Sequence, residues 1–229
     1  MLCAIPARGG SKRLPRKNLR TLAGRPLIAH TIDIARQSGL FEGVFVCTED
    51  QEIADVARAC GANVPILMPE ELCGDLVASH IPCQRLAVHL AGQGRSTDIL
   101  VCLQPTSPLR NADDVKEAVN KFRGNNDFDF LVSVTQVDPH DFHWAVVPNG
   151  DGYWRMYFGS EYMKERPLLP LVFRPNGSIK IARLPALAKV GHFFGERMGV
   201  VETPPARSVH VALEFDLKLC ELILAERTT

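Results

Sequence analysis

The chain has 229 residues, enough for one substantial hydrophobic core, and 46% of them are hydrophobic. Its 26 lysines and arginines equal its 26 aspartates and glutamates, so no overall field favours nucleic acid or an anionic membrane surface as a partner. No apolar run approaches the ~20 residues of a membrane-spanning helix, and the N-terminus lacks the pattern of a signal peptide, so we expect a cytoplasmic protein.

The seven cysteines are scattered along the chain, and their sequence contains no Cys-x-x-Cys pair. An odd number at irregular spacing is typical of small core residues in a reducing compartment. It does not favour a zinc site or a disulfide framework.

A turn rich in glycine and cationic residues directly follows the first predicted strand. Its adjacent glycines, Gly9 and Gly10, can direct successive backbone N–H groups into one concavity, because glycine tolerates positive φ angles and has no Cβ. Arg8, Lys12 and Lys17 would add positive charge around a polyphosphate. The spacing of a Walker loop is absent, but open α/β sheets bind ligands at such turns, which favours an anion site over a solvated basic loop.

Apolar runs and capped amphipathic stretches predict the remaining elements. The predicted strands are 1–5, 43–48, 64–68, 98–103, Phe130–Val137, 178–182 and Met198–Glu202. The predicted helices are 26–39, 79–91, 213–225, one capped by Asp50 and ending at Gly61, and one capped by Asn111. This alternation predicts an α/β fold with a doubly wound, mostly parallel sheet, whose ligands lie beyond the carboxyl ends of the strands.

The alternation is interrupted between about residues 138 and 173 by aromatic and proline-rich sequence, in which Asn149-Gly150 indicates a hairpin turn. Such an excursion is typical of an inserted flap or an oligomer contact. We favour an oligomer contact because aromatic residues are enriched in interface cores. The sequence shows no internal repeat or linker, so we expect a single domain over 1–229 with an insertion at 138–173.

Three motifs in matching order resemble those of the acylneuraminate cytidylyltransferases, the CMP-sialic acid synthetases and their relatives acting on pseudaminic, legionaminic and similar nine-carbon 2-keto acids. The motifs are Ala7-Arg8-Gly9-Gly10-Ser11-Lys12 with Leu14-Pro15 and Lys17-Asn18, Leu103-Gln104-Pro105-Thr106-Ser107-Pro108-Leu109-Arg110, and Phe173-Arg174-Pro175-Asn176-Gly177. The resemblance covers essentially the whole chain. It implies a Rossmann-like sheet of the nucleotide-diphospho-sugar transferase type and a homodimer formed through the insertion.

The resemblance also implies a reaction, in which CTP activates a nonulosonic acid to give the CMP-sugar and pyrophosphate, with Mg²⁺, or Mn²⁺ as the alternative, as the metal. The residues that it assigns to the nucleotide are Arg8, Gly9, Gly10, Ser11, Lys12, Lys17, Asn18, Ser79 and Gln104, of which Arg8, Lys12, Lys17 and Gln104 would also be catalytic. The residues that it assigns to the acidic sugar are Gln104, Arg166, Arg174, Asn176 and the pair Phe193-Phe194.

Taken one at a time, several of these residues have simpler interpretations. Arg110 equally suits an ion pair with Asp113 or Asp114, Gln104 suits a hydrogen-bonding role at a sheet end, Arg166 suits a solvated loop, and Phe193-Phe194 suits the core. The resemblance favours the ligand roles of Gln104, Arg166 and the two phenylalanines.

The sequence departs from the family pattern in the stretch 208–216. Two aspartates usually hold magnesium there, but this chain has His210 and Ala212. Magnesium prefers oxygen ligands, so imidazole is a poor substitute and a methyl group is none. His210 and Glu214 are the remaining candidate ligands. Arg13, at a position where glycine is usual, could add positive charge to the turn that follows the first predicted strand.

Two functional hypotheses follow: an active cytidylyltransferase of a divergent branch, or a nucleotide- or sugar-binding homologue that has lost turnover. We favour the enzyme, because residues for both substrates are present: Arg8, Lys12, Lys17, Gln104, Arg174 and Asn176. Transfer to an eight-carbon acid such as Kdo is a weaker alternative, because the paired phenylalanines resemble the nine-carbon group.

Overall fold

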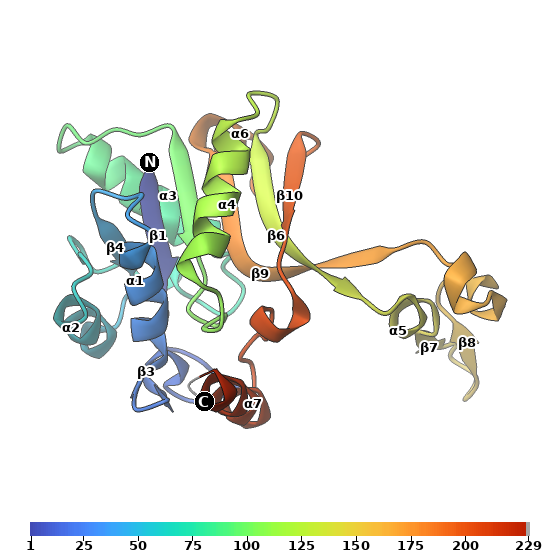
Figure 1. Ribbon diagram of the computed structural model, residues 1–229. Coiled ribbons are helices and arrows are strands. Elements are labelled where there is room, and N and C mark those ends of the chain that lie inside the picture. Colours follow the sequence, from blue (N-terminus) through green and yellow to red (C-terminus); the bar gives the residue numbers. More distant parts are fainter. Residues whose placement is uncertain (228–229) are drawn as a thin grey trace.

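Six strands form the central sheet of the computed structural model, which describes residues 1–227 (Figure 1). Their order is β10-β6-β9-β5-β1-β4, and their bounds are Leu2–Pro6 (β1), Val44–Cys47 (β4), Ile99–Leu103 (β5), Phe130–Val137 (β6), Val172–Arg183 (β9) and Met198–Glu202 (β10). Strand β1 pairs in parallel with β4 and β5, and β10 pairs in parallel with β6, whereas β9 is antiparallel to β5 and β6. The predicted mainly parallel α/β sheet is confirmed.

The order of the strands creates a switch point beside β1. The chain continues from β1 to β4 on one side of it, and later to β5 on the other side. Connections that diverge in this way leave a crevice outside the carboxyl ends of the two neighbouring strands. The loops that follow β1 and β5 therefore meet at one edge of the sheet.

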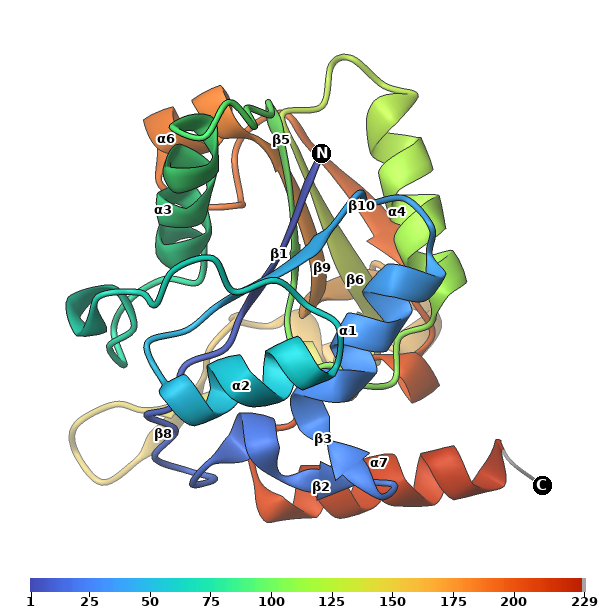
Figure 2. The same ribbon diagram turned by 90° about the vertical axis from the view of Figure 1, so that its left-hand side faces the viewer.

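Helices cover both faces of the sheet (Figure 2). On one face lie α1 (Leu27–Gln37), α2 (Gln51–Ala59) and α4 (Ala112–Arg123), and on the other lie α3 (His80–Ala91) and α6 (Leu184–Val190). Strand β1 shows the alternation behind this arrangement, because Cys3 and Ile5 belong to the first core and Leu2 and Ala4 to the second. Among the described residues, no helix is long and apolar enough to cross a membrane.

A third, smaller core joins the last helix to the start of the chain. Helix α7 (Glu214–Glu226) packs Leu217 and Cys220 against Leu14, Leu22 and Leu27. Two short strands, β2 (Thr21–Leu22) and β3 (Arg25–Pro26), form a hairpin in this region. The C-terminal segment is thereby held beneath the loop that follows β1.

The caps predicted for two helices are present. Asp50 accepts a hydrogen bond from the Ile53 backbone N–H at 3.0 Å at the start of α2. Asn111 and Asp114 form a reciprocal capping box at the start of α4, with distances of 2.8 and 2.9 Å. These two helix starts were therefore readable from local sequence.

The strand predicted at 64–68 is wrong. The chain passes beside β4 there, but it pairs with β4 only at Asn63, which accepts from Val46 at 2.9 Å and donates to Val44 at 2.7 Å. Pro65 has no N–H to continue a ladder, so the pairing ends after one bridge.

The strand predicted at 178–182 begins earlier than expected, at Val172. Pro175 and Gly177 are residues that weaken a strand interior. The pairing with β6 accommodates them through a register shift between Val132 and Val134, and Gly177 takes a positive φ of 75°. Strand β9 therefore extends well beyond the body of the sheet.

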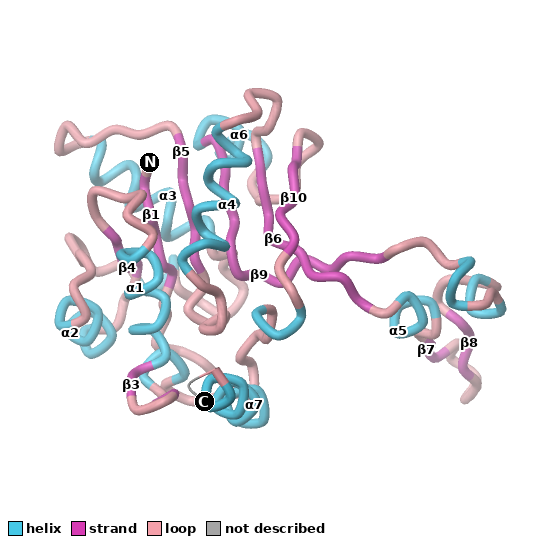
Figure 3. Tube along the Cα trace, viewed as in Figure 1, coloured by secondary structure: helices cyan, strands magenta, loops and turns pink. Residues whose placement is uncertain are grey.

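Strands β6 and β9 carry residues 138–171 away from the body, and we call this segment the arm (Figures 1 and 3). It contains α5 (Pro139–His143), β7 (Val146–Pro148), β8 (Trp154–Met156) and two 3₁₀ turns, Glu161–Met163 and Arg166–Leu168. The predicted hairpin turn at Asn149-Gly150 joins β7 to β8. Large apolar side chains of the arm are exposed, namely Trp144, Val146, Tyr153, Trp154, Tyr157, Met163, Leu168 and Leu171.

Candidate active site

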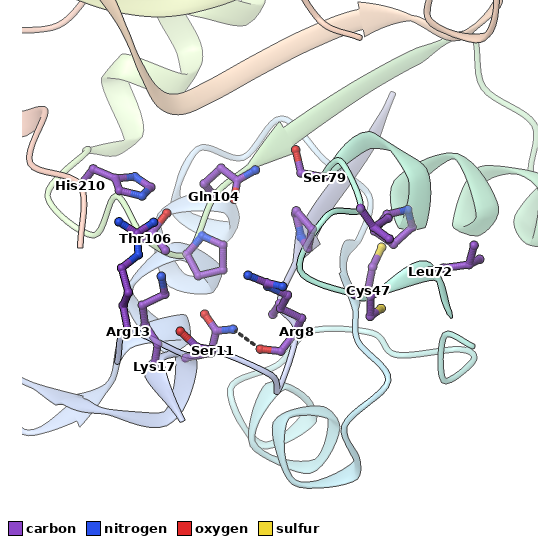
Figure 4. Close-up of a pocket in the computed structure, with 18 residues that line it drawn as sticks. Arg8, Ser11, Arg13, Lys17, Cys47, Leu72, Ser79, Gln104, Thr106 and His210 are labelled. Atoms are coloured by element: carbon purple, nitrogen blue, oxygen red, sulfur yellow. Dashed lines mark hydrogen bonds between the residues drawn. The ribbon is translucent and has the colours of Figure 1, made fainter. Parts of the chain in front are cut away.

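A cavity of about 260 Å³ lies where the loops after β1 and β5 meet (Figure 4). The expected nucleotide residues that line it are Arg8, Ser11, Lys17, Asn18, Ser79 and Gln104, and Arg13, Thr106 and His210 line it as well. Figure 4 shows Arg13, Lys17 and His210 grouped at one end, Ser79 and Cys47 at the other, and Gln104 between them. The structure therefore brings residues from five separate segments of the sequence to one cavity.

The cationic end of this cavity carries unbalanced positive charge. Lys17 begins a 3₁₀ turn, Lys17–Leu19, and its pKa is lowered by burial and by repulsion from Arg13 and Arg8. Cations that repel one another across a cavity are stabilised by an anion placed between them. The electrostatics therefore suit a bound anion.

We call the loop after β1, residues 7–18, the phosphate loop; contacts with neighbouring side chains determine its shape. The tolerance of glycine for positive φ angles is not used at Gly9 or Gly10, since neither lies in the left-handed region, whereas the lack of a Cβ matters at Gly9. Gly9 is required because a Cβ there would lie 2.4 Å from Oδ2 of Asp50. Its N–H donates to Glu49 at 2.7 Å, and the Asn18 amide donates to the Arg8 carbonyl at 2.9 Å, so the loop is fixed at several points.

An acidic residue occupies the outer side of this loop. Asp75 accepts from Arg8 at 2.6 Å and from Lys12 at 2.5 Å, and these two cations lower its pKa, Lys12 the more strongly. The Lys12 side chain is 84% exposed and lies outside the cavity of Figure 4. Sequence reasoning missed Asp75, although it lies only four residues before Ser79.

The wall that carries Gln104 is held by a buried arginine. Arg110 donates to the carbonyls of Gln104, Ser107 and Ser178 and to the Thr31 hydroxyl, and burial lowers its pKa to about 10. The expected ion pair of Arg110 is wrong. Asp113 pairs instead with Lys116 at 3.1 Å, and the nearest nitrogen of Arg207 lies 2.8 Å from Asp114.

A second cavity, of about 460 Å³, lies between the bases of β6 and β9 and the start of α7. Its polar lining includes Thr135, Asp138, Asp141, Arg174, His210 and Asp216. Of the expected sugar residues, Arg174 lines it directly. Arg166 approaches it from the arm through an ion pair with Asp138.

Gln104 lines the first cavity, whereas Asn176, Phe193 and Phe194 lie outside both cavity linings. The Asn176 amide is buried, donates to Thr203 and Ser208 at 2.6 and 3.0 Å, and accepts from Ser133 and the Ser178 N–H at 2.6 and 3.0 Å. Its hydrogen-bonding capacity is thus filled by protein.

The two phenylalanines differ in environment. Phe193 is buried in the core on the α3 face, where the Lys180 ammonium lies 5.5 Å from its ring centroid. Phe194 is 48% exposed. Only one of the pair therefore presents its ring to solvent.

The residues of the stretch 208–216 do not fit a protein-held magnesium ion. Glu214 forms a bidentate pair with Arg20 at 2.8 and 2.7 Å, and one oxygen of Asp216 accepts the N–H groups of Ala212 and Leu213 at 2.8 and 2.7 Å. In the described part of the chain no three His, Cys, Asp or Glu side chains cluster as metal ligands. His210 alone supplies no oxygen donor.

The fold, with a ligand cavity at a switch point and cationic side chains around it, defines the chain as a nucleotidyltransferase-type α/β protein. Residues 2–149 match the family model described as "Cytidylyltransferase". The chain belongs to the cytidylyltransferase family, and within it to the group that includes the acylneuraminate cytidylyltransferases.

Several relatives span most of this chain. The pseudaminic acid cytidylyltransferase of Campylobacter jejuni strain 81-176 is 39% identical over 97% of this chain and 95% of its own length. That of strain NCTC 11168 is 40% identical, but the match spans 60% of this chain and only 59% of that protein. The CMP-N,N'-diacetyllegionaminic acid synthase of Legionella pneumophila is 36% identical over 86% of this chain and 83% of its length.

A solved structure supports the fold alone. CMP:2-keto-3-deoxy-manno-octonic acid synthetase, complexed with CTP, superposes with a TM-score of 0.73 over 99% of this chain and 98% of that one, at 19% identity. The two chains therefore share a fold, whereas the substrate has to be argued from this chain's own site.

Proposed function

We propose that this protein transfers the CMP group of CTP to a nonulosonic acid and releases pyrophosphate. The observation that carries the proposal is the convergence of three cations, Arg8, Arg13 and Lys17, on the cavity beside β1 and β5, where the positive charges of Arg13 and Arg8 lower the pKa of Lys17. Transfer of CMP to an acidic sugar brings two anions together, so catalysis depends on positioning and on charge neutralisation. The names of the relatives point to the same reaction.

On the nucleotide side, we propose that the triphosphate lies against the cationic end of the first cavity and the cytidine against the end with Ser79. Arg8, Lys17 and the Ser11 hydroxyl would bind the phosphates, and Lys12 would join them from the outer side of the loop. Gln104, between the two ends, would lie beside the reacting groups.

On the sugar side, we propose that the carboxylate binds Arg174 in the second cavity, because a guanidinium holds a carboxylate by two parallel hydrogen bonds. Arg166 would act through its pair with Asp138. For Asn176 we propose that its part is to hold the strand that presents Arg174, and for Phe194 that its exposed ring packs on an acyl group.

Magnesium, or manganese in its place, was expected as the metal. The present side chains do not fit a protein-held ion, so we draw no step through a metal. We propose instead that the cations of the phosphate loop, Arg13 included, provide most of the neutralisation that this chain itself supplies.

We also propose that two copies of the chain associate through the arm. Its exposed aromatic and aliphatic side chains form a surface of the kind that is buried in obligate dimers. Within one chain the arm extends from the body on two strands only, which leaves this surface without an intramolecular cover in the described residues (Figure 1).

A binding homologue without turnover is the second candidate, and His210 and Ala212, at positions where the family has carboxylates, favour it.

The test that separates the two functions is pyrophosphate release from CTP in the presence of MgCl₂. Pseudaminic, N,N'-diacetyllegionaminic and N-acetylneuraminic acids are each supplied separately, and UTP is the matched control nucleotide. We expect release from CTP with at least one acid. Binding of CTP without release for every acid, in Mg²⁺ and in Mn²⁺, would favour the binding homologue.

A further inference from the structure

His210 stands where the two cavities meet. Among the described residues it is the one side chain that lines both the cavity with the phosphate loop and the cavity with Arg174. In Figure 4 its ring lies at the cationic end, next to Thr106. Any reaction between a ligand in one cavity and a ligand in the other takes place beside this imidazole.

The backbone on both sides of His210 is fixed, whereas its ring is free. Val211 is fully buried and donates its N–H to the Thr106 carbonyl at 2.7 Å. The buried Ser208 hydroxyl lies 2.9 Å from that of Thr203 and accepts from Asn176 at 3.0 Å. The imidazole itself makes no hydrogen bond to any described residue and is open to the cleft. The backbone therefore carries the ring to the junction of the two cavities, and both ring nitrogens are available to ligands.

The surroundings of His210 favour its neutral form. The charged groups that face it are Lys17 from the 3₁₀ turn after the phosphate loop, Arg174 and Lys180 from β9, and Asp216 from α7. The ring is partly exposed, but its partial loss of water within the cleft is the largest influence and repulsion from Lys17 the next, so the pKa of His210 lies below its ordinary value of 6.5 despite the opposing effect of Asp216. At neutral pH the free ring can accept a proton.

A bound triphosphate would bring the pKa of His210 closer to neutral pH. Its negative charge would offset that of Lys17 and raise the pKa of the imidazole toward neutrality, where a general base is most effective. No described carboxylate lines the first cavity, and the two acids nearest in sequence are engaged elsewhere: Glu214 is held by Arg20 and Asp216 by the backbone of the helix start.

We propose that His210 is the general base of the transfer. The imidazole accepts the proton of the sugar's anomeric hydroxyl while that oxygen bonds to the α-phosphorus of CTP. The bond from the α-phosphorus to the bridging oxygen of the β-phosphate breaks, and pyrophosphate leaves with the electron pair. This inference rests on the proposed function, and it gives the residue that replaces a family carboxylate a role of its own.

The first test compares His210→Gln, which keeps polar atoms but cannot accept the proton, with the matched control His89→Gln on α3, outside both cavities. General base catalysis contributes roughly 10²–10⁴-fold, so kcat of His210→Gln should fall at least about 100-fold while the Kd for CTP stays within about threefold. In the wild type kcat/KM for the acid should fall as pH drops through the pKa of the imidazole, and this acid limb should vanish in the variant. Retention of the acid limb, or of kcat within about threefold, would overturn the proposal.

The second test compares the MgCl₂ dependence of His210→Gln with that of His210→Asp, to distinguish a general base from a metal ligand. If His210 is the base, the MgCl₂ concentration for half-maximal rate in the residual activity of His210→Gln should match that of the wild type. A large rise in that concentration in His210→Gln, reversed in His210→Asp, would show a ligand role and contradict the proposal.

A readout without turnover distinguishes failure of this inference from failure of the proposed function. In the free wild-type protein, the imidazole resonance assigned through His210→Gln should titrate below pH 6.5, and addition of CTP should raise its pKa. A titration that CTP leaves unchanged would place His210 away from the nucleotide and overturn the inference even in an active enzyme. A CTP-dependent shift of the imidazole pKa, in a protein that converts none of the nonulosonic acids, would overturn the proposed function while keeping His210 beside the triphosphate.

Discussion

Arg110 carries a buried positive charge that is stabilised by carbonyl groups. It is 2% exposed, and its guanidinium joins the end of β5 at Gln104 to β9 at Ser178 and to α1 at Thr31. Oxygen dipoles from three elements thus offset the loss of water around the charge. The same contacts fix the backbone of a cavity wall.

We expect Arg110→Met to lower the free energy of unfolding by about 3 kcal/mol or more, because it leaves several buried carbonyls without a donor. The measurement is urea denaturation followed by circular dichroism. Arg123→Met, on the exposed end of α4, is the matched control and should change stability by less than about 0.5 kcal/mol. Equal effects of the two substitutions would contradict a structural role for Arg110.

The two glycines of the phosphate loop provide a matched pair. A Cβ on Gly9 would collide with the Asp50 carboxylate, which caps α2, whereas a Cβ on Gly10 would meet no atom within 4 Å. Gly9→Ala should therefore lower the free energy of unfolding by about 1–2 kcal/mol through the disturbed cap, and Gly10→Ala should be nearly neutral. Thermal unfolding of both variants checks this. A Gly9→Ala variant as stable as the wild type would show that the Asp50 side chain moves aside without loss of stability.

Single residues differed in how far the sequence predicted their environment. Lys17 and Gln104 were assigned to the nucleotide site by resemblance, and both line the cavity. Phe193 was assigned to a ligand wall, yet it is buried. The direction of a side chain in an irregular segment depends on the strands packed around it, and this information is non-local. The position of His210 between two cavities was hidden for the same reason.

Among the elements, those with strong local signals were predicted well. Strands β6 and β10 have the predicted bounds, since each contains clustered apolar residues and is flanked by turn-forming residues. Helix α6 was missed, although Pro185 in its first turn was a usable signal, because it is only seven residues long. The antiparallel placement of β9 depends on the whole sheet and on the excursion through the arm, which periodicity does not reveal.

The arm is the element whose exposed surface most needs a partner. Tyr153 and Trp154 are 72% and 66% exposed, and Leu168 is 71% exposed. We expect sedimentation equilibrium to give about twice the 25.3 kDa mass of one chain. The double variant Trp154→Glu/Leu168→Glu should give the monomer mass at the same concentration, because charge is not tolerated in an apolar interface.

A control for this experiment is Val88→Glu, an equally exposed apolar position on α3 outside the arm. It should leave the mass of the assembly unchanged. A monomeric wild type, or a dimer that survives both charges in the arm, would contradict the proposed association.

At the scale of the whole molecule, an electrically neutral chain concentrates positive charge in one cleft. The 26 basic and 26 acidic residues cancel overall, while Arg8, Arg13 and Lys17 converge on the first cavity, whose described lining includes no acidic side chain. Local charge of this kind attracts a small anionic ligand without attracting polyanions in general. The two cavities share one edge of the sheet, so a nucleotide and an acid bound there would meet at His210.

The measurement that tests the central claim most directly is the identification of the product. The protein is incubated with CTP, MgCl₂ and an equimolar mixture of the three acids used for pyrophosphate release, and the mixture is resolved by mass spectrometry. The account predicts a CMP-sugar of one of these acids, formed in equal amount with pyrophosphate and absent when CTP is replaced by UTP. Recovery of unchanged CTP and unchanged acids, from a protein that binds CTP, would contradict it.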